Sequence, residues 1–152
     1  MTGRACARVT FRIQITFDCA DPRRLAEFYA KALHYEHQGV PSGFATWVEY
    51  YKAYNVPEEE RDDGAAILDP EGKRPRIWFH RMDTPKPLKN RLHLDLYVGN
   101  APRATVGERK ATVDPEVARL VALGATVQQA FEEDGYYFVT CLDPEGNEFD
   151  VA

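Results

Sequence analysis

Apolar and polar residues alternate strictly from Phe11 to Asp18, which predicts a strand with one buried face and one open face. A helix is predicted next, because Asp21 can cap its first turn and Pro22 is tolerated there. The apolar residues of this helix recur at helical spacing and form a stripe that can pack on a sheet. They are Leu25, Phe28, Tyr29, Ala32 and Leu33.

The rest of the first half predicts three more strands, over 44–50, 65–68 and 76–82. The charged segment 51–64 has no periodicity and is predicted to be a loop. The sequence Asp-Pro-Glu-Gly at 69–72 suits a type I turn, with proline at its second and glycine at its fourth position. The first half is therefore predicted to be one βαβββ unit.

The second half repeats this order of elements. Alternation returns over 91–98, and a helix is predicted to begin at Asp114 and Pro115 and to end near Gly124. A second Asp-Pro-Glu-Gly turn precedes the last strand, as in the first half. The strands predicted after this helix cover 126–131, 136–142 and 147–151.

The duplication predicts an α+β fold of two tandem βαβββ modules, with eight strands in a curved, partly open sheet around a central cavity. Helices are expected to cover the outer face of the sheet. The first module covers 9–83, the linker 84–90 and the second module 91–152. With 152 residues, the two modules are expected to form one structural domain overall.

Composition narrows the functional class. The chain has 19 basic and 24 acidic residues, a net charge of -5 and no basic run, which argues against a nucleic-acid partner. No segment approaches the roughly 20 apolar residues of a membrane span, and the first residues lack the apolar core of a signal peptide. The odd number and wide spacing of Cys6, Cys19 and Cys141 predict reduced thiols. We therefore expect a cytoplasmic protein with a small-molecule partner.

Alternation also predicts which side chains face the cavity. If the apolar residues of each strand pack on the helices, an amide, two imidazoles and several carboxylates point inwards. These inward residues include Gln14, His80, His93, Asp95, Glu148 and Asp150. The aromatic residues expected along the same space are Trp47, Trp78, Tyr97 and Tyr137. Apolar walls with a few converging polar groups are typical of a small-molecule pocket.

Two readings of the inward polar residues are open. Two histidines, a glutamine oxygen and a carboxylate suit a divalent transition metal and leave coordination positions free. Without a metal, the histidines would be solvated and Gln14 would form hydrogen bonds across strands. Asp95 and Glu148 are candidates for general bases, or they are structural hydrogen-bond acceptors.

Three segments resemble the vicinal oxygen chelate superfamily and its glyoxalase-like and bleomycin-resistance-like proteins, in their order and in their duplication. The segments are 14–33, 89–98 and the stretch from 117 that ends in DPEGNEFDV. The resemblance covers nearly the whole chain. It implies the paired βαβββ fold, a homodimer, and a metal held by one residue from each of four strands.

The same resemblance implies particular ligands. Gln14, His93 and Asp150 fall at three of the ligand positions of that superfamily. Trp78 falls at the fourth, where an indole cannot coordinate a metal, and His80 shares its face two residues on.

The leading hypothesis is a metal-assisted lyase or isomerase that acts on a substrate with adjacent oxygen atoms. Gln14, His80, His93 and Asp150 would hold nickel, zinc, manganese or iron, and a carboxylate would move the proton. The resemblance also implies an alternative, a metal-free protein that sequesters a drug-like or aromatic ligand. A third hypothesis is an extradiol-type dioxygenase, which needs iron with open positions.

Overall fold

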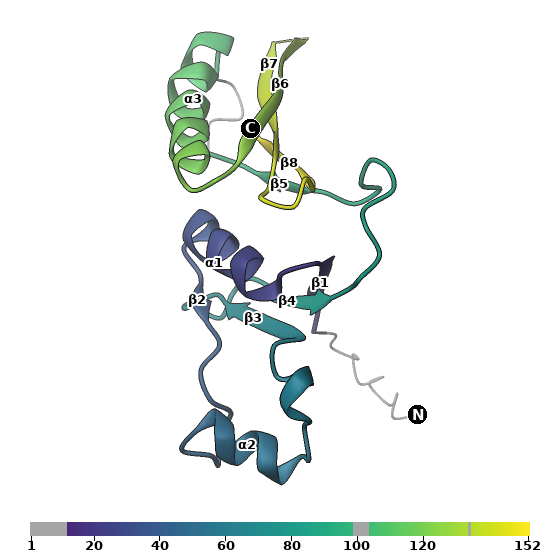
Figure 1. The fold of residues 1–152 in the computed structure, drawn as a ribbon. Coiled ribbons are helices and arrows are strands. Elements are labelled where there is room, and N and C mark those ends of the chain that lie inside the picture. Colours follow the sequence, from purple (N-terminus) through teal and green to yellow (C-terminus); the bar gives the residue numbers. More distant parts are fainter. Residues whose placement is uncertain (1–11, 99–103, 134) are drawn as a thin grey trace, which may run out of the picture.

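The structure is a computed structural model that describes residues 12–98, 104–133 and 135–152 (Figure 1). The elements of the first half are β1 (Gln14–Cys19), α1 (Pro22–Leu33), β2 (Glu36–His37), α2 (Trp47–Ala53), the 3-10 helix η1 (Glu58–Glu60), β3 (Gly64–Leu68) and β4 (Arg76–Arg81). Those of the second half are β5 (Leu94–Leu96), α3 (Val106–Ala122), β6 (Thr126–Glu133), β7 (Tyr136–Leu142) and β8 (Glu148–Val151).

The eight strands form two four-stranded sheets with the same topology. Their orders are β1-β4-β3-β2 and β5-β8-β7-β6. In each sheet the first strand of the module runs parallel to the last, and the remaining pairs are antiparallel. This repeat confirms the predicted α+β fold of tandem βαβββ modules, although its strands are divided between two sheets (Figure 1).

Helix α1 forms over the predicted residues and lies between the two sheets (Figure 1). The Asp21 side chain accepts a hydrogen bond from the Arg24 amide at 3.0 Å and caps the first turn. Tyr29 is fully buried, and its ring contacts Phe79 of the first sheet and Phe149 of the second, at centroid distances of 5.8 and 6.4 Å. The modules therefore share one hydrophobic core.

Polar contacts from the second module fix both ends of α1. Glu145, in the second Asp-Pro-Glu-Gly turn, accepts hydrogen bonds from the Ala20 and Asp21 amides at 2.7 Å each. At the other end, Arg119 donates to the carbonyls of Lys31 and Ala32. The second module thus supplies an acid to the N-terminus and a cation to the C-terminus of this helix, which suits the helix dipole.

The strand predicted over 44–50 is wrong, because this segment contains helix α2. Thr46 accepts a hydrogen bond from the Glu49 amide at 3.2 Å and begins the helix. The aromatic residues Trp47, Tyr50 and Tyr51 of this helix are spaced three and four apart, as on one helix face. The second strand of the sheet is instead the two-residue β2. The segment 51–64 holds the end of α2 and η1 in addition to loop.

The second helix begins earlier than predicted. Thr105 and Glu108 form a reciprocal capping box, so α3 starts at Val106 and Pro115 lies inside it. Asp114, expected as the cap, instead accepts a hydrogen bond from the Tyr137 hydroxyl at 2.7 Å. Gly124 follows the helix end with a positive φ of 115°, as a C-terminal glycine does.

Two further expectations concern whole-chain properties. Among the described residues, no helix is long and apolar enough to cross a bilayer. Cys19 and Cys141 are buried free thiols, while Cys6 lies outside the described residues. Burial raises the pKa of Cys141 to about 11, so this thiol is protonated at neutral pH.

Candidate functional site

The face of the first sheet that points away from α1 carries Arg76, Trp78 and His80. These residues alternate along β4 with Ile77 and Phe79, which are buried beneath α1. A pocket of about 760 Å³ lies between this face and α2. Its volume is in the range of small-molecule sites.

Aromatic rings form much of the pocket wall. Trp47, Tyr50 and Tyr51 come from α2, and the rings of Trp47 and Tyr51 stack at 5.7 Å. Trp78 comes from β4 and lies against Gly64 of β3, where a Cβ atom would come within 2.2 Å of the indole. The tryptophans predicted to contact a ligand therefore share one pocket.

Three arginines border the same pocket: Arg23, which is paired with Asp62, and two that lie against aromatic rings, Arg61 and Arg76. The Arg76 guanidinium lies 5.0 Å from the centre of the Trp78 ring and donates to the amide oxygens of Gln38 and Gln14. The Arg61 guanidinium lies 5.4 Å from the centre of the Tyr51 ring. Both cations thus lie against π-faces, an arrangement that stabilises a positive charge.

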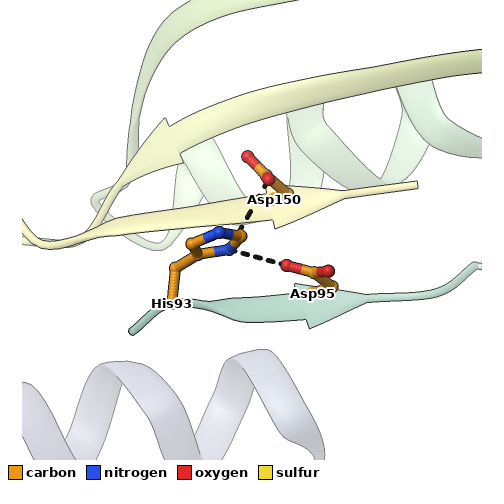
Figure 2. A group of neighbouring side chains, drawn as sticks. All are labelled: His93, Asp95 and Asp150. Carbon is orange, nitrogen blue, oxygen red and sulfur yellow. Dashed lines mark ion pairs between the residues drawn. The ribbon is translucent and has the colours of Figure 1, made fainter. Parts of the chain in front are cut away.

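A different group of side chains forms a cluster of metal-binding type on the second sheet (Figure 2). Asp95 of β5 and Asp150 of β8 are paired in the parallel register, so they lie side by side on one face. His93, two residues before Asp95, points towards both carboxylates in Figure 2. Its Nδ1 is 2.7 Å from a carboxylate oxygen of Asp95 and 3.6 Å from one of Asp150.

A neighbouring hydroxyl orients this cluster. Thr140 of β7 is paired with Asp150 and donates a hydrogen bond to its Oδ1 at 2.6 Å. The other oxygen, Oδ2, faces His93. One ligand atom from each member of the cluster lies within 4.8 Å of the others, a spacing that a single ion can bridge.

A smaller cavity of about 170 Å³ adjoins His93 at the boundary of the two modules. The β1 residues Thr16 and Asp18 line it from the first module, Asn90 from the linker and Asn147 from the second module. The Asp18 carboxylate is 3.4 Å from Nδ1 of His80. This cavity therefore combines polar side chains from both halves of the duplication.

The four residues expected to bind a metal together are divided between two places. His93 and Asp150 share the cluster on the second sheet. Gln14 accepts a hydrogen bond from Arg76, and His80 lies beside Asp18 on the wall of the large pocket. Asp95, expected as a general base, belongs to the same cluster and lies closer to the His93 imidazole than Asp150 does.

Glu148, the other expected base, is buried between the second sheet and the linker. Its Oε2 accepts a hydrogen bond from the Asn90 amide at 3.0 Å, and its Oε1 accepts one from Lys86 Nζ at 3.3 Å. Burial acts to raise its pKa, but these hydrogen bonds lower it below its usual value. Glu148 is thus an ionised side chain that holds the segment before β5.

The remaining two aromatic residues lie away from the large pocket. Tyr97 is 77% exposed at the end of β5, beside a different surface hollow. Tyr137 is buried beneath α3, and its hydrogen bond to Asp114 together with burial raises its pKa to about 12. Of the four aromatic residues predicted to contact a ligand, Trp47 and Trp78 line the large pocket.

The charged residues that the sequence analysis missed at these sites include Asp18, Arg76 and Arg61. Asp18 continues the polar face of β1 after Gln14 and Thr16, so the alternation contained the signal for it. Arg76 likewise shares the face of Trp78 and His80, two residues earlier in β4. Arg61 had no such signal, because it lies in a segment without periodicity.

Comparisons with known proteins agree with this architecture. The profile of one family, described as Glyoxalase-like domain, matches residues 14–152. A glyoxalase/bleomycin resistance protein/dioxygenase family enzyme from Burkholderia phytofirmans PsJN is 16% identical, with 91% of this chain and 94% of that chain covered and a TM-score of 0.59. A possible glyoxalase from Bacillus cereus is 14% identical, with coverages of 94% and 98% and a TM-score of 0.54.

A mutant of the fosfomycin resistance protein FosX from Listeria monocytogenes, solved with Mn(II) and 1S,2S-dihydroxypropylphosphonic acid, is 13% identical. The match covers 95% of this chain and 90% of that chain, with a TM-score of 0.58. No curated protein matches the chain. At these identities the structural likeness concerns the fold.

Proposed function

Because this chain belongs to the glyoxalase-like domain family, we propose that it is a metal-assisted enzyme that acts on a small molecule with adjacent oxygen atoms. The observation that carries this proposal is the cluster of His93, Asp95 and Asp150. A bound divalent ion would polarise substrate oxygens and stabilise negative charge that develops on them. The fold relative FosX, solved with Mn(II), supports the proposal.

The donor atoms of the cluster suit such an ion. One imidazole nitrogen and two carboxylates are ligands for manganese, iron or zinc, and a set of three leaves positions free for a substrate. The Thr140 hydroxyl, which fixes one oxygen of Asp150, is the kind of outer partner that orients a ligating carboxylate. We therefore assign Asp95 to the ligand set, in place of its expected role as a base.

The small cavity beside His93 supplies the groups that would bind and deprotonate the substrate. The Thr16 hydroxyl and the amides of Asn90 and Asn147 offer hydrogen bonds to substrate oxygens. We assign the proton transfer to Asp18, a carboxylate on the wall of the same cavity. His80 then keeps a role in the reaction by holding the Asp18 carboxylate in place.

Metal analysis tests this proposal. The wild-type protein, reconstituted with manganese, zinc, nickel or ferrous iron and desalted, should retain close to one equivalent of an ion. His93→Ala and Asp150→Asn should retain at least about tenfold less, because each removes one of three ligands. His37→Ala is the matched control, since His37 is an exposed histidine whose partner, Glu27, lies outside the cluster.

Circular dichroism must show that the variants remain folded. Equal metal retention by wild type and His93→Ala would contradict the proposal, and so would the absence of binding by any of these ions. Asp18→Asn should retain the metal but lose turnover of a 2-oxoaldehyde-type substrate, the class that such a site would activate.

The large aromatic pocket favours a second function, which is non-catalytic binding of a small molecule. Its wall contains none of His93, Asp95 and Asp150, so this binding would not depend on a metal. Ligand affinity that persists in a chelator would support this function. The dioxygenase hypothesis is less favoured, because the cluster offers one imidazole instead of the usual two.

A further inference from the structure

Helix α2 covers a hollow with aromatic side chains. None of its residues is buried, although Trp47, Tyr50 and Tyr51 are large and apolar. Figure 1 shows α2 standing away from the sheet beyond β3. Aromatic rings that line a pocket without being buried retain apolar surface that a ligand can cover.

Trp78 and small residues of β3 line one side of this pocket. The Trp78 indole lies across Gly64, and the next residue of β3 on the same face is Ala66, which is paired with Trp78. Small residues on β3 thus leave room for the indole, and the Arg76 guanidinium lies over the same ring. A planar ring can pack beside this indole and guanidinium in an offset arrangement.

The cation beside this indole has no carboxylate partner in the described part of the chain. Arg76 donates only to the neutral amide oxygens of Gln38 and Gln14. Burial lowers the pKa of Arg76 below that of a free guanidinium, as expected for a charge withdrawn from water. A partly buried guanidinium without a counter-ion is typical of a site for an anionic group.

A second arginine of the wall is also incompletely paired. Nε of Arg61 is buried and has no hydrogen-bond partner among the described residues. Its nearest carboxylate is that of Glu58, at 4.0 Å and on a side chain that is 89% exposed. An anionic ligand could reach the terminal nitrogens of this guanidinium, but not its buried Nε.

Acidic residues on the pocket wall do not cancel this positive charge. Glu27 is paired with Lys31 and His37, and Asp63 is paired with Arg81. Glu60, at the rim, is the third acidic residue of the wall. The unpaired charge near Trp78 is therefore that of Arg76.

We infer that this pocket binds a planar aromatic molecule that carries a carboxylate, with its ring beside Trp78 and its carboxylate at Arg76. This inference rests on the second proposed function, small-molecule binding, and names the class of its ligand. It is independent of the metal cluster. Trp47 closes the pocket from the opposite side, so both tryptophans of the chain report on ligand binding.

Three probes separate charge from shape in calorimetric titrations of the full chain with EDTA present. They are 2-naphthoate, its neutral analogue 2-naphthamide and the non-aromatic cyclohexanecarboxylate. We expect saturable binding of 2-naphthoate and at least about tenfold weaker binding of the other two, which lack the charge or the ring. Tryptophan emission, corrected for absorption by the probe, should change as 2-naphthoate binds.

Variants locate the carboxylate. Arg76→Gln should weaken 2-naphthoate at least about tenfold and leave 2-naphthamide unchanged. Arg61→Gln should show a smaller loss of the same kind. Arg24→Gln, an exposed arginine of α1 outside the pocket wall, is the control and should bind like wild type.

The outcomes distinguish the ligand class from the binding function. Equal affinity for 2-naphthoate and 2-naphthamide, or an Arg76→Gln variant that binds 2-naphthoate normally, would overturn the anionic ligand and leave small-molecule binding standing. No binding of any probe in the millimolar range would overturn both. If size-exclusion measurements then show a dimer, and its tryptophan emission differs from that of the dilute monomer without any ligand, a second copy of the chain fills the pocket instead.

Discussion

The Trp78 indole lies against the backbone of Gly64, so closely that a Cβ atom at position 64 would be 2.2 Å from Cη2 and Cζ2 of the ring. The two residues belong to neighbouring strands, β3 and β4. Gly64 does not adopt the left-handed backbone conformation, so glycine is needed here for space alone. This contact fixes one side of the large pocket.

Gly64→Ala should therefore displace the indole. We expect a loss of about 1–3 kcal/mol in the free energy of unfolding, as for other overpacked positions, and a shift of tryptophan emission. Gly39→Ala is the control, because a Cβ atom there meets nothing within 4 Å. Urea unfolding and fluorescence spectra check both variants. Identical spectra for Gly64→Ala and wild type would contradict the assigned position of the ring.

The hydrogen bond from Thr140 to Asp150 predicts an indirect effect on metal binding. Thr140→Val preserves the shape of the side chain but removes the donor that orients the carboxylate. Metal affinity should fall by about 10–100-fold while all three ligands remain. Thr126→Val, at an exposed position of β6, should retain wild-type affinity. Competition titrations with a chromogenic chelator measure the difference, and equal affinities would show that Thr140 has no such role.

Tyr29 connects the two modules through its hydroxyl, which donates to Asp143 Oδ2 at 3.1 Å. Tyr29→Phe retains the ring contacts but leaves a buried carboxylate with one donor fewer. We expect a loss of about 1–2 kcal/mol in the free energy of unfolding. Tyr136→Phe, at an exposed position of β7, should have no measurable effect. If both variants unfold at the wild-type urea concentration, the hydrogen bond contributes nothing to stability.

Asp69 and Asp143, which begin the two Asp-Pro-Glu-Gly turns, have different electrostatic environments. An ion pair with Arg74 at 2.8 Å, helped by backbone amides, holds the pKa of Asp69 well below its usual range. Burial instead raises the pKa of Asp143, against the hydrogen bonds that it accepts. Asp69 therefore stabilises the fold above the ordinary carboxyl pKa of about 4, and this contribution is lost as the pH falls through its lowered folded-state pKa.

For Asp143 the sign is opposite. Its raised pKa means that the folded state binds the proton more tightly than the unfolded state, so its ionisation destabilises the fold as the pH rises. The stability difference between wild type and Asp69→Asn should shrink between pH 7 and about pH 3. As the pH falls over the same range, the stability of the wild type relative to Asp143→Asn should increase. Urea unfolding at several pH values measures both, and a common trend would contradict the two assignments.

Much of the fold was predictable because its signals are local. Alternation located β1 and β4, and the stripe from Leu25 to Leu33 predicted α1 and its buried face. The prediction was wrong where two periodicities coincide in a short aromatic segment, as at α2. It was also wrong where a proline typical of a helix start lies inside a helix, as Pro115 does in α3.

Alternation predicts the face of a strand on which a side chain lies, but not the distance between strands of different modules, so it could not predict which candidate residues lie together. His93 and Asp150 come together since β5 and β8 are hydrogen-bonded neighbours. Gln14 and His80 lie on the other sheet, where Arg76 and Asp18 provide their partners. Such separation follows from the packing of two sheets around α1, which no short sequence pattern encodes.

The most direct test of the proposed metal site is an anomalous difference map from crystals of the protein grown with zinc. The account predicts a single strong peak about 2.0–2.2 Å from an imidazole nitrogen of His93 and from carboxylate oxygens of Asp95 and Asp150. A peak on Gln14 and His80 without these three residues, or no peak at the His93 cluster at saturating zinc, would contradict it.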